Sequence, residues 1–197
     1  MPRNGDAVRR RLQDAALDLY TKNGFDQTTT AQIAAQAGVT ERTFFRHFAD
    51  KREVFFDGEV ELIEKLMEAV RSTPDGAAPL DMLIRAFTAV APLVEANRPI
   101  LAPRQRVIEA VPALQERALA KSAAVTAALA QALVERGTEP ALAMLAARTG
   151  IAAFGFAAAT WHGDVSSSLA SHVEGAFAQL CGLTQLGGGG ADQRSGN

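Results

Sequence analysis

The chain of 197 residues is poor in the residue types that build disulfide frameworks, metal sites and many catalytic centres. It has one cysteine, one tryptophan, one tyrosine and three histidines. The single Cys181 excludes an intramolecular disulfide, and its place in an apolar run predicts a small buried side chain. His47, His162 and His172 are scattered and belong to no metal-binding or nucleophile motif. We therefore expect no cofactor and no metal.

One short segment looks catalytic when it is taken alone, Trp161-His162-Gly163-Asp164. It falls at the expected junction of two helices, where His and Gly end one helix and Asp caps the next. We interpret this segment as a structural junction and expect the protein not to be an enzyme.

Charge and hydropathy set further limits. Apolar residues make up 48% of the chain and charged residues 21%, which is typical of a globular protein. The N-terminus is charged and has no apolar stretch, which predicts a cytoplasmic protein. Residues 141–161 are apolar enough to suggest a membrane span, but Arg148 interrupts them and alanine dominates, so a helix packed on other helices is expected.

The net charge of −2 is divided unevenly along the chain. Residues 1–55 carry nine Lys/Arg against seven Asp/Glu, whereas the remainder carries 11 against 15. A mildly basic front on an acidic body suits a protein that touches nucleic acid with one face only.

Apolar residues recur at helical spacing through most of the chain, and no segment alternates as a strand does. The pattern predicts an all-α fold of about nine helices. We expect a DNA-binding head over residues 1–52, a helical body over 53–186, and a disordered Gly-rich tail over 187–197. Expected helices cover about 7–23, two short stretches within 29–48, and segments beginning near Asp50, Leu80, Asn97, Pro112, Glu139 and Asp164.

Residues 24–51, GFDQTTTAQIAAQAGVTERTFFRHFADK, are the most informative part of the sequence. Thr29 stands three residues before Gln32, the spacing of a capping box at the start of a helix. Gly38 then allows a left-handed turn, and Thr40 is a good N-cap for a second helix. Phe44 and Phe48 are expected to point inward. Two short helices, a tight turn and a basic leading edge predict a helix-turn-helix.

These residues resemble the DNA-binding domain of the TetR family of bacterial transcription regulators. The matching positions follow one another over about fifty residues, which makes the resemblance specific. It implies a three-helix head on a helical body that binds a small ligand and dimerises. The residues that carry it are Leu12, Ala15, Ala16, Leu19, Tyr20, Gly24, Phe25, Thr28, Thr29, Ile33, Ala34, Ala37, Gly38, Val39, Thr43, Phe44, Phe45, His47, Phe48 and Lys51.

The resemblance assigns DNA contacts to both helices of the helix-turn-helix, which we call the reader helices. The start of the second helix is expected to meet base edges, for which arginine on guanine is the commonest specific pairing. Other side chains are expected to hold the phosphate backbone. Phe45 departs from the family, which usually has tyrosine there, so a phosphate contact is lost or replaced by packing on sugar. The expected DNA-binding residues are Thr28, Thr29, Thr40, Arg42, Thr43, Phe45, Arg46, His47 and Lys51.

The body of such regulators holds an effector, and an arginine among apolar residues is a plausible partner for an anionic head group. The alternative is that the arginine is exposed on an amphipathic helix and that the aromatic residues belong to the core. The sequence leaves both interpretations open. The candidate ligand residues are Phe87, Leu101, Arg104, Val107, Met144, Phe154 and Phe156.

Dimerisation is implied by the resemblance and by need, since one short helix reads too few base pairs. Small residues near the C-terminus permit close helix contact across a two-fold axis, although packing inside one subunit would use the same residues. The candidate interface residues are Ala146, Gly150, Ala153, Ala157, Leu169, Val173 and Phe177.

The sequence therefore predicts a bacterial, cytoplasmic, homodimeric transcription regulator. Its expected partners are a pseudo-palindromic double-stranded DNA operator, a second copy of the chain and a small apolar or amphipathic effector, but no membrane. We expect a repressor that this effector releases from DNA. The alternative is a DNA-binding protein with a solid body and no effector.

Overall fold

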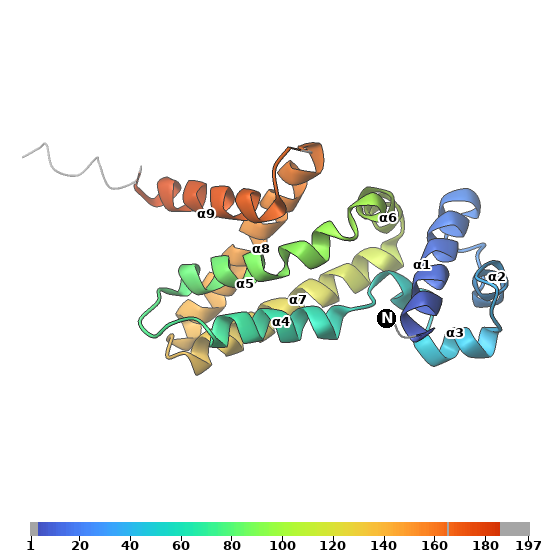
Figure 1. The fold of residues 1–197 in the computed structure, drawn as a ribbon, viewed down its shortest axis with the longest axis horizontal. Coiled ribbons are helices and arrows are strands. Elements are labelled where there is room, and N and C mark those ends of the chain that lie inside the picture. The colour runs from blue at the N-terminus through green and yellow to red at the C-terminus, as the bar shows by residue number, and fades with distance from the viewer. Residues whose placement is uncertain (1–3, 165, 186–197) are drawn as a thin grey trace, which may run out of the picture. The chain divides into compact units, whose positions relative to one another are not determined.

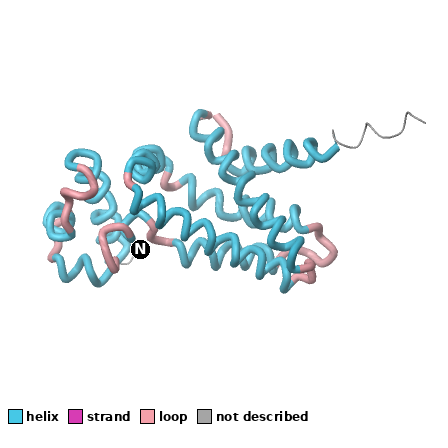
Figure 2. Tube along the Cα trace, turned by 180° about the vertical axis from the view of Figure 1, so that it is seen from behind, coloured by secondary structure: helices cyan, strands magenta, loops and turns pink. Residues whose placement is uncertain are grey.

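The computed structural model describes residues 4–164 and 166–185. Within these ranges the chain forms nine α-helices and one 3₁₀ turn, and it has no strand (Figures 1 and 2). The all-α prediction is confirmed. The predicted disordered tail, 187–197, lies outside the described residues.

The helices divide into two compact units, each with its own packing. The first unit contains the chain up to residue 59 together with residues 99–121, and the second contains residues 60–98 and the chain from 122 onward. The predicted domain boundary after residue 52 stays a prediction. The structure adds that residues 99–121 pack with the N-terminal helices.

The first unit is built from three N-terminal helices and a pair from later in the chain. These are α1 (Asn4–Asn23), α2 (Thr30–Gln36) and α3 (Glu41–His47), the 3₁₀ turn η1 (Glu53–Phe55), α6 (Arg98–Ala110) and the first part of α7 (Pro112–Glu135). Their core includes Phe44 and Leu12 from the N-terminal helices and Ile108 and Leu114 from α6 and α7. The later pair is therefore part of the core on which the N-terminal helices rest.

The second unit contains α4 (Glu59–Arg71), α5 (Pro79–Glu95), α8 (Pro140–Gly163), α9 (Leu169–Gln185) and the rest of α7. Helices α5, α8 and α9 pack on one another. Gly150 permits this approach, because a Cβ there would lie 2.9 Å from Leu83 Cδ1 and 3.2 Å from Phe87 Cε2. Small residues on α8 thus serve close packing inside the chain.

Two predicted helix starts are wrong. Asp50 does not begin a long helix: its carboxylate accepts N–H bonds from Arg52 and Glu53, and only the short turn η1 follows. Gly58, with φ +79°, then takes a left-handed conformation that separates η1 from α4. Asp164 does not cap α9 either, since the Leu169 N–H at that helix start donates to Glu95 Oε1 at 2.6 Å.

The structure also bears on the expected burial of Cys181 and on the long apolar helices. The Cys181 side chain is exposed, so its predicted burial is wrong: it lies outside the buried face of α9. Helices α7 and α8 are long and apolar enough to cross a membrane by length and composition alone. One face of α8 packs against α5 and α9, as a core helix does.

Candidate DNA-binding site

The first reader helix begins with the predicted capping box. Thr29 Oγ1 accepts the Gln32 N–H at 3.2 Å, and the Thr29 N–H donates to Gln32 Oε1 at 2.8 Å. These two bonds satisfy backbone donors that the first turn would leave free. The helix therefore starts at a residue that the local sequence specifies.

The turn between α2 and α3 also follows from its residues. Gly38 takes a φ of +68°, a left-handed conformation that costs glycine little. The Val39 N–H then donates to the Ala34 carbonyl at 2.9 Å, and Thr40 Oγ1 accepts the Thr43 N–H at 3.2 Å. The turn thus fixes where α3 leaves α2, which is the geometry a helix-turn-helix needs.

Helix α3 has one buried and one exposed face. Phe44 is fully buried and Phe48 almost so, whereas Phe45 is 53% exposed. Arg42 and Arg46 are also exposed, and Thr43 is half-buried against Thr40. The exposed face therefore presents two guanidinium groups and an aromatic ring, which suit base edges, phosphate and sugar.

Lys51 binds the loop between α1 and α2. Its ammonium donates to the Phe25 carbonyl at 2.8 Å and the Thr28 carbonyl at 3.0 Å, and it lies 4.2 Å from the centre of the Phe25 ring. Tyr20 connects the same segments, because its hydroxyl donates to the Lys51 carbonyl at 2.6 Å. The structure gives Lys51 an internal role in addition to the phosphate contact predicted for it.

Thr28 and His47 are less accessible than the sequence suggested. The Thr28 hydroxyl is buried and donates to the Gly24 carbonyl at 2.8 Å. His47 Nε2 is buried without a hydrogen-bond partner among the described residues. Burial lowers the pKa of His47, and Arg46 and Arg9 lower it further, which favours a neutral imidazole. A phosphate contact through the Thr28 hydroxyl or through His47 Nε2 requires that atom to become exposed.

We expect Lys51→Met to lower the free energy of unfolding by about 1–3 kcal/mol, because two carbonyls lose a charged donor. Lys22→Met is the matched control, since within the described residues Lys22 forms only an exposed pair with Asp18 one turn away. Urea unfolding of both variants measures the difference. Equal stability of the two variants would leave Lys51 with the phosphate contact alone.

The predicted ligand residues fall into separate groups. Phe87 and Phe154 stack with ring centres 4.8 Å apart inside the second unit, while Met144 and Phe156 are exposed. The others, Leu101, Arg104 and Val107, lie on α6 in the first unit. The seven residues are therefore divided between the two units.

The predicted interface residues are buried by the packing of the chain itself. Ala146, Gly150, Ala153 and Ala157 all lie on the buried face of α8, and Leu169, Val173 and Phe177 on that of α9. They have almost no surface to offer a second copy. Leu142, Leu145 and Phe156 of α8 are instead exposed, and they share another face of the helix.

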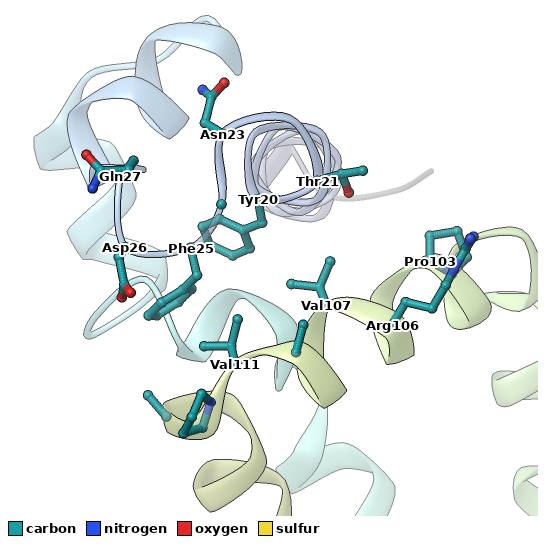
Figure 3. A pocket seen from close by; sticks show the side chains of 14 residues that line it. Tyr20, Thr21, Asn23, Phe25, Asp26, Gln27, Pro103, Arg106, Val107 and Val111 are labelled. Carbon is teal, nitrogen blue, oxygen red and sulfur yellow. The ribbon is translucent and has the colours of Figure 1, made fainter.

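The first unit contains a cavity of about 860 Å³ that the sequence did not predict. Tyr20 of α1 and Phe25 just after it face Val107 of α6 and Val111 just after it across the cavity, and Arg106 lies on the α6 side (Figure 3). Its lining comes from segments about eighty residues apart in sequence, so no local pattern could have disclosed it.

The sequence also missed the ion pairs that tie α7 to the N-terminal helices. Arg117 Nε lies 2.7 Å from Glu53 Oε1, and its Nη2 lies 2.6 Å from Glu59 Oε2. The guanidinium also lies over the Phe56 ring at 5.0 Å. These acids raise the pKa of Arg117.

Helices α2 and α3, joined by a tight turn and packed on α1, form the helix-turn-helix of a DNA-binding protein. Comparison with known proteins agrees. The family described as "Bacterial regulatory proteins, tetR family" matches residues 12–57, and the "MftR C-terminal domain" matches residues 77–185. The second match covers 109 of the 197 residues. The chain belongs to the TetR family of transcriptional regulators and is not an enzyme.

Individual relatives are similar over part or most of the chain. The HTH-type transcriptional regulator TcmR of Streptomyces glaucescens is 39% identical over 95 residues, 44% of this chain and 42% of TcmR. The chain thus spans less than half the length of this curated relative.

Two solved structures share the fold. FadR of Thermus thermophilus, a TetR-family repressor solved with lauroyl-CoA, has a TM-score of 0.53 at 24% identity, covering 88% of this chain and 93% of FadR. A transcriptional regulator from Rhodococcus sp. Rha1 has a TM-score of 0.51 at 23% identity, covering 91% and 96%.

Proposed function

We propose that this regulator is a cytoplasmic homodimeric repressor. Each subunit places α3 in the major groove of one half of a pseudo-palindromic operator, and a small amphipathic effector lowers the affinity for that operator. The exposed face of α3 carries the proposal: its buried face is fixed by Phe44, so the side chains opposite are held outward.

Base reading is assigned to the start of α3, with Arg42 as the main reader and Thr40 and Thr43 beside it. Arg42 is exposed and takes part in no ion pair or hydrogen bond with the described residues, so its five donors are available. Thr29, Arg46 and His47 are assigned to the phosphate backbone, and Phe45 to a sugar.

The effector response is supported by the shared core of the first unit. Ile108 and Leu114 are buried in the same cluster as Phe44 and Ile33 of the reader helices. Because α6 and the start of α7 are part of this core, a ligand that moves them also changes the support of α3. The effector then acts by a population shift, since it binds better to a form that fits DNA poorly.

The dimer interface is assigned to the outward face of α8. Leu142, Leu145 and Phe156 are 50%, 62% and 51% exposed, and Ala152 lies between them at helical spacing. An apolar stripe with this exposure on a helix of 24 residues suits a self-complementary contact about a two-fold axis.

The test is selection of bound DNA from a random pool, followed by titration of the winning sequence with Arg42→Ala. We expect an enriched pseudo-palindrome and a loss of about 1–3 kcal/mol in binding to it, because a good bidentate arginine contact discriminates by that amount. Arg85→Ala, an exposed arginine on α5, removes the same charge far along the chain and should change little.

Unaltered sequence discrimination in Arg42→Ala would reject the base-reading role. Failure to enrich any sequence, even after unfolding and refolding to strip a bound molecule, would reject the operator itself.

A further inference from the structure

Arg117 of α7 joins two acids that stand on either side of a break between helical segments. Glu53 begins η1, Glu59 begins α4, and Gly58 between them has a φ of +79°. The guanidinium donates to Glu53 through Nε at 2.7 Å and through Nη2 at 3.0 Å, and the same Nη2 donates to Glu59 Oε2 at 2.6 Å. One side chain therefore connects α7 to both sides of this break.

The contact is shielded from solvent to a degree that surface ion pairs are not. The side chains of Arg117, Glu53 and Glu59 are 24%, 30% and 16% exposed. The guanidinium also lies 5.0 Å from the centre of the Phe56 ring, which is buried. A bidentate arginine–carboxylate contact has a fixed geometry and, when partly desolvated, is stronger than an exposed pair. Arg117 therefore holds this segment in one position.

The turn η1 belongs to the support of the reader helices. Phe55 is buried in the same core as Ile33 of α2 and Phe44 of α3. Its ring also lies 5.2 Å from that of Tyr20, on α1. Because packed interiors leave little free volume, a displacement of η1 changes the packing behind α3.

Loss of the Arg117 cation would act on η1 in two ways. The link to α7 would be broken, and Glu53 and Glu59 would lose the partner that they share. Both carboxylates contact the same Nη2 atom, so they lie close together, and both are half-buried. Without the cation they would repel each other across Gly58 and resist desolvation.

We propose that Arg117 is a positioning residue for DNA binding. By holding Glu53 and Glu59 together it fixes η1, and through η1 it keeps the reader helices in the arrangement that fits the operator. Arg117 does not touch DNA in this role. The consequence for operator affinity rests on the proposed function, in which α3 reads the DNA, whereas the effect on η1 and the reader helices does not.

Arg117→Met tests this role, because it removes the charge and keeps an apolar side chain beside the Phe56 ring. We expect its affinity for the selected operator to fall about 3- to 30-fold, the usual size of effect for a residue that acts through others. Its affinity for random-sequence DNA should fall much less. Fluorescence anisotropy titrations with both DNAs give the ratio, at a temperature where circular dichroism shows the variant to be folded. Arg117→Lys keeps the charge without the bidentate contact and should lie between.

Arg136→Met is the matched control. Arg136 is likewise half-buried, with 22% of its side chain exposed, and it binds Asp75 and the Thr73 carbonyl within the second unit. Its loss removes the same charge and should lower stability without changing the ratio of the two DNA affinities. An equal change of this ratio in Arg136→Met would mean that Arg117 has no positioning role.

Glu53→Gln separates positioning from charge. It removes a negative charge, so electrostatics alone would raise its affinity for every DNA. We expect a lower operator affinity instead, as in Arg117→Met, and the double variant should be no worse than Arg117→Met alone, because the same contact is lost in each. A higher operator affinity in Glu53→Gln would overturn the proposal. If Arg117→Met does not fold, Glu53→Gln carries the same test.

Amide hydrogen exchange without DNA is the second readout. In Arg117→Met the amides of η1, α2 and α3 should exchange faster than in the original chain and in Arg136→Met. Unchanged exchange in the reader helices would overturn the proposal, and so would an unaltered ratio of DNA affinities. If the original chain selects no operator, the proposed function fails, and hydrogen exchange alone decides whether Arg117 positions the reader helices.

Discussion

Replacing Phe44 by alanine is expected to remove about 3–5 kcal/mol of stability, the usual cost of truncating a buried phenylalanine. Phe44 is fully buried, and its ring lies 5.6 Å from that of Phe48 in the core that joins α3 to α1 and α6. Urea unfolding followed by circular dichroism gives the difference. Operator binding should fall with it, because the support of α3 is lost.

Phe45→Ala is the control for this change, on the same helix and with the same atoms removed. Its ring is 53% exposed, so stability should change by about 0.5 kcal/mol or less. Operator affinity should still decrease, because Phe45 is assigned to a sugar. Two equally destabilised variants would mean that α3 has no distinct buried and exposed faces.

Local signals in the sequence were sufficient for the reader helices. Thr29, Gly38 and Thr40 act through hydrogen bonds and backbone angles within a few residues, so their spacing predicts the structure that forms. The burial of Phe44 and Phe48 follows from helical periodicity in the same way. These features need no knowledge of the rest of the chain.

Features that depend on distant segments were not predictable. Nothing in residues 99–121 states that Ile108 and Leu114 complete the core of the reader helices, or that Arg117 pairs with Glu53 and Glu59.

The candidate sites show the same division. An arginine among apolar residues is unusual, which makes Arg104 recognisable in the sequence, whereas the side chains beside it, Leu17 and Phe55, come from distant segments. The alanines and glycine of α8 suit close helix contact of any kind, and the sequence cannot say which contact. The structure uses them against α5, where Gly150 meets Leu83.

This distinction leads to the second large expected effect, on the dimer. The double variant Leu145→Glu/Phe156→Glu should be monomeric in sedimentation experiments, because it places charge on the apolar stripe proposed as the interface. In a two-fold contact each substitution occurs twice, so four apolar side chains are lost. Burying such a side chain contributes about 1.5–3 kcal/mol, so the loss is large.

The monomer should also bind operator only about as well as random DNA, since specific and non-specific affinities commonly differ by about 10³-fold or more. Val60→Glu/Leu119→Glu is the matched control: those residues are 70% and 72% exposed, carry the same kind of change, and lie on α4 and α7. If the control variant dissociates while the α8 variant stays dimeric, the interface includes α4 or α7 and not the α8 stripe. The α8 stripe lies outside the reader helices, so the double variant leaves α3 unaltered. Loss of operator binding by this variant would therefore show that dimerisation is needed in addition to base reading.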